Sequence, residues 1–210
     1  MLSATEIVDL QDQKTVAWHQ SPSGPEEQAS SGLQTAAGWR HLVARQHRAN
    51  FDLWHIEDEA RAPGATESEL ATLKRRVDQT NQLRNNLAEE LDEVILHWLA
   101  ARGLPNQDAA LHSESPGLII DRLSILALKI YHTRGETQRP DAPKGHAARN
   151  SQRLAILEEQ RADLANCLDA LWSETLAGTR RFKIHRQLKM YNDPTLNPAV
   201  YRKFVKEETR

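Results

Sequence analysis

The chain has few cysteines, few aromatic residues and no long hydrophobic run. Its one cysteine, Cys167, excludes a disulfide within the chain and is typical of proteins from a reducing compartment. We expect this cysteine to pack inertly in an apolar helix stretch. The N-terminus lacks the basic and apolar regions of a secretory signal, and the longest apolar run, around residues 118–131, is too short and too charged to span a bilayer. These absences predict a cytoplasmic protein without membrane insertion.

The chain also lacks an excess of positive charge. Its formal net charge is −2 and its pI is near 6.5. Binding to nucleic acid without sequence preference requires a broad basic surface. The one local basic run, residues 180–189, is more typical of a solvated face, and few aromatic residues are present to stack on bases. We therefore expect no nucleic-acid partner.

Apolar periodicity and turn residues divide the chain into helices. Ser3 and Glu6 form a capping box that opens a short helix, which is expected to end near residue 18. Residues 19–33 are rich in Ser, Gly, Pro and Glu, a composition typical of a mobile linker. Long amphipathic helices are expected over residues 34–61, 67–102, 117–133 and 149–177. A short helix, an irregular turn and a last helical turn are expected to follow.

These elements predict an all-α fold. The expected architecture is an antiparallel bundle of four long helices with short N- and C-terminal helices, because no segment has a convincing strand pattern. Thr66 and Glu69 form a second capping box, and Pro116 suits the first position of the helix over 117–133. We expect residues 1–33 to be an N-terminal helix and flexible linker, and residues 34–210 to be a single helical-bundle domain.

The most informative feature is a set of polar residues on otherwise apolar helix faces. Gln46, His47, Asn50 and Glu57 occupy the apolar stripe of the first long helix, and Arg84 interrupts the stripe of the second. An ion buried without a partner is destabilising by several kcal/mol, on the order of the measured effects of broken buried pairs. Such residues therefore either pair with one another or form a site.

Further charges fall on the third and fourth long helices. If the helices pack in register, their midpoints meet in one polar layer. That layer would hold four cations against two carboxylates: Arg84, Arg122, Lys129 and Arg161 against Glu57 and Asp121. A surplus of cations favours an anion supplied from outside. The competing interpretation is that the long Arg and Lys side chains reach the surface and the remaining charges form structural ion pairs.

The polar layer leads to a functional hypothesis. We expect the protein to bind an anionic, phosphorylated small molecule, such as a sugar phosphate, nucleotide or nucleotide-sugar. In an enzyme, the four cations would hold the anion, Gln46 and Asn50 would orient it, and Glu57, Asp121 or His132 would exchange protons in a hydrolysis or transfer reaction. His132 is the best general acid or base candidate, because it lies near Asp121 on its helix face. Whether the protein is an enzyme stays open.

The alternative is a non-catalytic interaction module. In that case the face of the second long helix between Asp78 and Asp92 docks a partner protein, and the buried charges only set the helix register. Self-association into a homo-oligomer is also left open by the sequence.

A divalent metal has weaker support, and the cofactor stays unknown. Glu89 and Asp92 have the spacing of the paired carboxylates that bind magnesium in all-helical nucleotide pyrophosphatases, but the matching acids on the preceding helix are missing. His55 and Asp58 share one helix flank and offer ligands of mixed type. The sequence has no HExxH motif, no paired ExxH set and no glycine-rich phosphate loop.

Four strings in the same order resemble one protein family. They are LWHIEDEAR (53–61), KRRVDQTNQLRNN (74–86), IDRLSILALKIYH (120–132) and QLKMYNDPTLNP (187–198). The chain from about Trp39 to the C-terminus resembles the bacterial family of uncharacterised helical proteins called domain of unknown function 4254. The resemblance implies an all-helical cytoplasmic bacterial protein, with no established activity, and a glycosyltransferase of cell-envelope glycan assembly as partner.

The resemblance also implies a set of site residues. The motif positions carried over are Glu57, Arg84, Asn85, Asp121, Arg122, Lys129, His132, Lys189, Tyr191, Asn192 and Asp193. In the last string, Lys189 and Tyr191 would close as a lid over the mouth of the bundle. The other interpretation of that string is a purely structural turn, since Asn and Asp before Pro cap turns with their own side chains.

Overall fold

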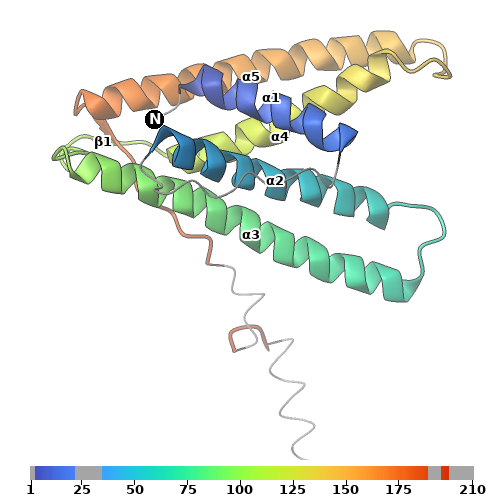
Figure 1. Ribbon diagram of the computed structural model, residues 1–210, viewed down its shortest axis with the longest axis horizontal. Coiled ribbons are helices and arrows are strands. Elements are labelled where there is room, and N and C mark those ends of the chain that lie inside the picture. Colours follow the sequence, from blue (N-terminus) through green and yellow to red (C-terminus); the bar gives the residue numbers. More distant parts are fainter. Residues whose placement is uncertain (1–2, 22–34, 189–194, 199–210) are drawn as a thin grey trace, which may run out of the picture.

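The structure is a computed structural model that describes residues 3–21, 35–188 and 195–198. Within these residues the chain is predominantly helical, so the predicted all-α class is confirmed (Figure 1). The elements in chain order are α1 (Ala4–Gln20), α2 (Ala36–Ala60), α3 (Glu67–Ala100), β1 (Ala110–Leu111), α4 (Pro116–Thr137), α5 (His146–Leu176) and β2 (Arg180–Arg181).

The helices begin where the sequence predicts. Ser3 and Glu6 make the expected capping box at α1, and Thr66 and Glu69 make the second one at α3. Pro116 is the first residue of α4, where its missing N–H leaves no intrahelical bond unmade. Two boundaries differ from the prediction: α4 ends at Thr137 rather than near residue 133, and α5 begins at His146, three residues earlier than expected.

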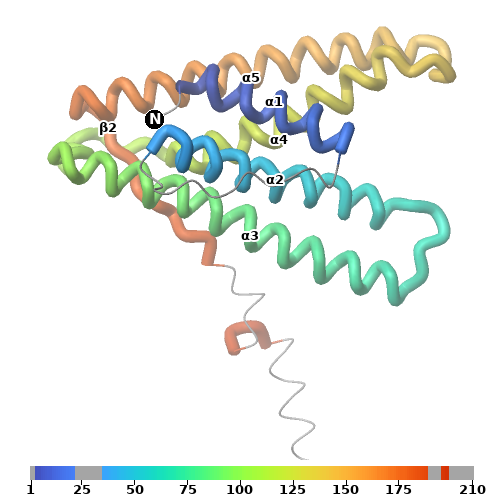
Figure 2. Tube along the Cα trace, in the orientation of Figure 1, coloured from blue at the N-terminus to red at the C-terminus, as the bar shows by residue number. Residues whose placement is uncertain are grey.

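The helices form two neighbouring pairs, with α1 lying against both. Short loops join α2 to α3 and α4 to α5, and the members of each pair lie side by side (Figure 2). The helix α1 packs against α4, α2 and α5. It supplies Ala4, Ile7 and Leu10 to the same buried cluster that holds Leu42, Leu91 and other residues of the long helices. The hydrophobic core therefore draws on all five helices.

The start of α4 lies very close to α3. A Cβ atom at Gly117 would come within 2.2 Å of the carbonyl oxygen of Ala88, so only glycine fits there. Asp92 of α3 replaces a local cap: its Oδ1 accepts a hydrogen bond from the Gly117 N–H at 2.7 Å, and Ser115 Oγ donates to its Oδ2. Burial raises the pKa of Asp92 to about 7.

Two sequence expectations were wrong. Residues 180–181 do not begin a helix; they form β2, which pairs in parallel with β1. This pairing joins segments some 70 residues apart, which a local pattern does not reveal. Cys167 is exposed, because it lies on a flank of α5 beside the face that buries Leu164 and Leu168. None of the helices in the described ranges is long and apolar enough to cross a membrane.

Candidate functional site

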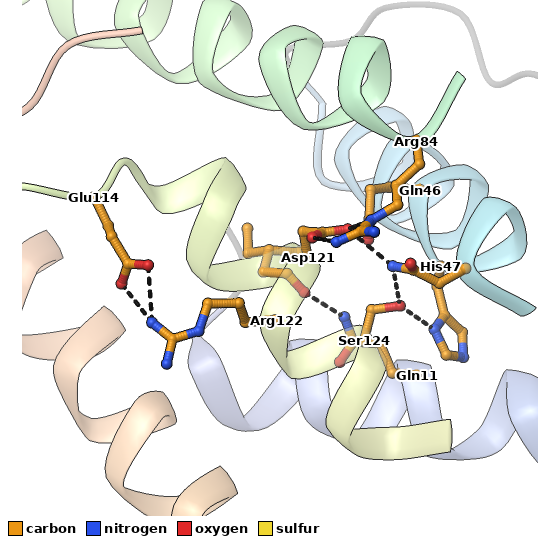
Figure 3. A network of polar contacts seen from close by, with 10 residues as sticks. Gln11, Gln46, His47, Arg84, Glu114, Asp121, Arg122 and Ser124 are labelled. Carbon is orange, nitrogen blue, oxygen red and sulfur yellow. Dashed lines mark hydrogen bonds and ion pairs between the residues drawn. The ribbon is translucent and has the colours of Figure 1, made fainter. Parts of the chain in front are cut away.

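The carboxylate of Asp121 forms the centre of a buried polar network. Its Oδ1 accepts hydrogen bonds from Gln46 Nε2 at 2.6 Å, Asn50 Nδ2 at 2.9 Å and Arg84 Nε at 2.8 Å. Its Oδ2 accepts from Arg84 Nη2 at 2.5 Å (Figure 3). Three helices, α2, α3 and α4, therefore meet at one carboxylate. We call Gln46, His47, Asn50, Arg84, Asp121 and Ser124 the polar centre.

His47 extends the polar centre to α1. Thr15 Oγ1 donates to the carbonyl of Gln11 at 2.8 Å, so this oxygen accepts the Nε2–H of His47 at 2.8 Å. The Nδ1 atom of His47 then accepts from Ser124 Oγ at 2.7 Å, and Ser124 Oγ in turn accepts from Asn50 at 2.9 Å. Burial lowers the pKa of His47 to about 3, so the ring is neutral near pH 7.

The other predicted cations lie elsewhere. Arg122 points away from Asp121 and binds both oxygens of Glu114 at 2.8 and 2.7 Å (Figure 3). Arg161 binds both oxygens of Asp12 at 2.8 Å, and Lys129 is exposed. The expected layer with a surplus of buried cations is therefore wrong. Consecutive helix residues point about 100° apart, so a neighbour of a buried carboxylate easily faces water.

A cleft of about 380 Å³ lies beside the polar centre. Its lining combines apolar and charged side chains: Asn50, Leu53, Trp54, Glu57, Asp58, Arg61, Arg84, Ile125 and Leu128. Arg84 belongs both to the polar centre and to the lining of the cleft. One edge of its guanidinium binds Asp121, while Nη1 makes no hydrogen bond to any residue that the structure describes. The cleft thus brings together three of the predicted site residues, Asn50, Glu57 and Arg84.

The carboxylates of Asp121 and Glu57, both predicted to exchange protons, differ in the chemistry that they can perform. Asp121 accepts four hydrogen bonds from three side chains and does not line the cleft, so it holds the helices and Arg84 in place. The side chain of Glu57 is 41% exposed in the cleft, and among the residues that the structure describes its carboxylate accepts only from Arg61 Nη1, at 2.8 Å. Glu57 is the candidate general acid or base of the cleft.

Two further predicted residues, His132 and Asn85, belong neither to the polar centre nor to the cleft lining. The ring of His132 stacks on Trp54, with ring centres 4.6 Å apart and an interplanar angle of 4°. Burial lowers its pKa, and the neighbouring rings of His19 and His55 lower it further. Asn85 is half-buried on α3 and does not line the cleft.

Four predicted site residues, Lys189, Tyr191, Asn192 and Asp193, lie outside the described residues. The lid that they were expected to form stays a prediction.

The acidic pair on α3 is used structurally. Glu89 accepts hydrogen bonds from Arg186 Nη1 at 3.0 Å and from the Gln187 N–H at 2.8 Å, while Asp92 caps α4. Both carboxylates already have donors, so their spacing of three does not create an open magnesium site.

Sequence reasoning missed three members of the network. Gln11 and Thr15 are buried on α1, and Ser124 is buried on α4. The signal was present but weak: Gln11 and Thr15 stand four residues apart, on the face that carries the core residue Ile7. A lone serine in an apolar helix, such as Ser124, gives no warning by itself.

One comparison with known proteins gives a match. Neither a curated protein nor a solved structure matches the chain. The sequence model of one family, described as a protein of unknown function (DUF4254), matches residues 40–184. This range includes the polar centre and the whole cleft lining, whereas the string at 187–198 lies beyond it. Since the match covers well over half of the 210 residues, the chain belongs to the DUF4254 family.

Proposed function

We propose that the protein binds a small phosphorylated sugar in the cleft between α2, α3 and α4. The observation that carries this proposal is the position of Arg84, which is fixed by Asp121 on one edge and lines the cleft with the other. The sequence-based hypothesis is thereby kept, but the ligand moves from the polar centre to the cleft beside it.

Arg84 is the anchor for the phosphate in this proposal. A guanidinium binds phosphate oxygens through two parallel N–H groups, and it does so best when its orientation is already set. The Asp121 carboxylate sets that orientation and remains buried behind the guanidinium. Arg61, at the rim of the same cleft, supplies a second cation.

The remaining lining suits the sugar rather than a second phosphate. The lining contains two acidic side chains, Glu57 and Asp58, and two basic ones, Arg61 and Arg84, so the cleft carries as many acidic as basic groups. The lining therefore has no surplus of cations for a second phosphate, whereas sugar hydroxyls can donate hydrogen bonds to its carboxylates. Trp54 and the neighbouring leucines offer an apolar wall for the C–H face of a sugar ring.

The size of the cleft narrows the ligand further. Small-molecule sites range from about 300 to 1,000 Å³, and a cleft of about 380 Å³ lies at the small end. A monosaccharide phosphate therefore fits better than a nucleotide-sugar. Sugar phosphates are common in the cytoplasm, in agreement with the location expected from the sequence. We further propose that the four long helices, α2 to α5, act as an antiparallel frame around the site.

The binding experiment is calorimetry with four probes: a hexose 1-phosphate, a hexose 6-phosphate, the free hexose and inorganic phosphate. We expect one phosphorylated hexose to bind more tightly than either of its two parts. Arg61→Ala and Glu57→Gln change exposed cleft residues, so they should weaken binding roughly 10-fold each with the fold intact. Arg122→Ala is the matched control, since it removes an exposed arginine that already has a carboxylate partner.

The outcomes separate the alternatives. Equal binding by wild type, Arg61→Ala and Glu57→Gln would refute the cleft as the site, and so would the absence of binding by all four probes. Release of inorganic phosphate or sugar from the bound ligand, lost in Glu57→Gln, would identify an enzyme. Binding without turnover would identify a protein that binds the sugar phosphate without transforming it.

A further inference from the structure

Three histidines from three different helices converge next to the cleft. They are His19 near the end of α1, His55 in α2 and His132 in α4, and each offers one ring nitrogen within 4.8 Å of the other two. Among the residues that the structure describes, no other group of three potential metal ligands comes together in this way. The cluster lies apart from the polar centre, and Trp54 separates it from the cleft by stacking on His132.

A hydrogen bond orients the ring of His19, and a carboxylate lies near the outer nitrogen of His55. Nδ1 of His19 bonds to the carbonyl oxygen of Thr15 at 2.7 Å, which makes Nδ1 the protonated nitrogen and leaves a lone pair on Nε2. Nδ1 of His55 lies 3.8 Å from Oδ2 of Asp58, so the Nε2 atom of His55 is the nitrogen that remains available to a metal ion. A backbone carbonyl or a carboxylate behind the outer nitrogen is the usual support of a metal-bound histidine.

Two of the available nitrogens are buried without a partner. Nε2 of His19 and Nε2 of His132 have no hydrogen-bond partner in the described part of the chain, although both atoms are closed off from solvent. A buried polar atom left in this state is destabilising unless something binds it. Among the described residues, nothing occupies the centre of the cluster to accept the lone pairs of these nitrogens, which is the role that a metal ion would have.

Aromatic neighbours hold the rings in place. His19 stacks on Tyr131 with ring centres 4.2 Å apart, and Phe51 packs edge-on against both His19 and His55. His132 stacks on Trp54. Rings restricted in this way lose little freedom when they bind an ion, which favours binding.

From this geometry we infer that His19, His55 and His132 bind one divalent transition-metal ion of the zinc class. Nitrogens in a tetrahedral zinc site lie roughly 3.3 Å apart, given Zn–N bonds of about 2.0–2.1 Å. The widest separation between two ligand nitrogens in the cluster, up to 4.8 Å, exceeds this value by about 1.5 Å, and small side-chain rotations can close that difference. Imidazole suits zinc and its neighbours, whereas magnesium and calcium prefer oxygen ligands, so neither of those two should bind.

The inferred metal site is separate from the proposed sugar-phosphate site, and one of its ligands lies outside the range that the family model matches. Three protein ligands leave a fourth position for water, as in catalytic rather than structural zinc sites. His19 precedes residue 40, so it lies outside the range that the family model matches. The ion would join the end of α1 to α2 and α4, and thereby stabilise the position of α1 on the other helices.

The test uses the full chain without an affinity tag, freed of metal by a chelator and titrated with Zn²⁺ by calorimetry. We expect one Zn²⁺ per chain, and X-ray absorption of the wild-type zinc protein should give three nitrogens at about 2.0–2.1 Å. His55→Ala removes the ligand that is 37% exposed, so its fold should persist while its zinc affinity falls by about 100-fold or more. His97→Ala, at an exposed histidine outside the cluster, is the matched control and should bind like wild type.

Several results would overturn the inference. They are no stoichiometric zinc binding by wild type, wild-type affinity in His55→Ala, and an absorption spectrum with mainly oxygen or sulfur ligands. Equal binding of Mg²⁺ would contradict the choice of metal class. The absorption measurement uses the wild-type protein alone, so the inference can be tested even if a histidine variant fails to fold.

Discussion

Replacing Asp121 by alanine tests the role of the polar centre most directly. The change removes the acceptor of four hydrogen bonds and leaves three donor side chains, Gln46, Asn50 and Arg84, without it. Arg84 is the most affected, because its side chain is only 23% exposed and it loses the carboxylate that balances its charge.

The magnitude follows from burial. Removing one partner of a buried ion pair destabilises a protein by about 3–5 kcal/mol, since an uncompensated charge stays behind. For a chain of this length that corresponds to a fall in Tm of roughly 6–20 °C. Total stabilities are on the order of 5–15 kcal/mol, so Asp121→Ala should still fold but with a small margin.

The ion pair between Arg122 of α4 and Glu114, which precedes that helix, provides the control. Arg122 Nη1 contacts both oxygens of Glu114 at 2.8 and 2.7 Å, but the two side chains are 54% and 34% exposed. Exposed pairs contribute about 0–1 kcal/mol, so Glu114→Ala should lower the free energy of unfolding by no more than that. Urea unfolding followed by circular dichroism gives both values. Equal losses in the two variants, or a loss below about 1 kcal/mol in Asp121→Ala, would refute the argument from burial.

Three further predictions concern the buried polar groups and the contact between α3 and α4. Gly117→Ala should lower the free energy of unfolding by about 1–3 kcal/mol, measured in urea, because the new Cβ would meet the Ala88 carbonyl; wild-type stability would contradict the close approach. Burial raises the pKa of Asp92 from 3.8 to about 7, so the folded state holds a proton that the unfolded state releases above about pH 4. The free energy of unfolding of wild type, measured by urea titration at several pH values, should therefore fall between about pH 4 and 7, and less steeply in Asp92→Asn, which copies the protonated form. The pKa of His47 is lowered from 6.5 to about 3, so its contribution to stability is present above pH 6.5 and lost as the pH falls toward 3. Its NMR ring signals should remain those of neutral imidazole at pH 5, and protonation near pH 6.5 would disprove the burial argument.

The sequence alone predicted the helices and several of the important polar residues. Capping boxes at Ser3 and Thr66 depend only on residues three positions apart, so they could be read directly and were confirmed. The polar interruptions Gln46, Asn50, Arg84 and Asp121 were recognised because an apolar stripe makes a polar residue stand out, and they do contact one another.

Partner choice was decided only by the tertiary structure. Arg84, Arg122 and Arg161 look alike in a helical pattern, yet one binds the central carboxylate, one binds Glu114 and one binds Asp12 of α1. A difference of one residue turns a side chain by about 100°, and the packing angles of the helices then decide which group it meets. The histidine cluster shows the same limit. His19, His55 and His132 are far apart in sequence and have no common spacing, so only the packing of α1 against α2 and α4 brings their nitrogens together.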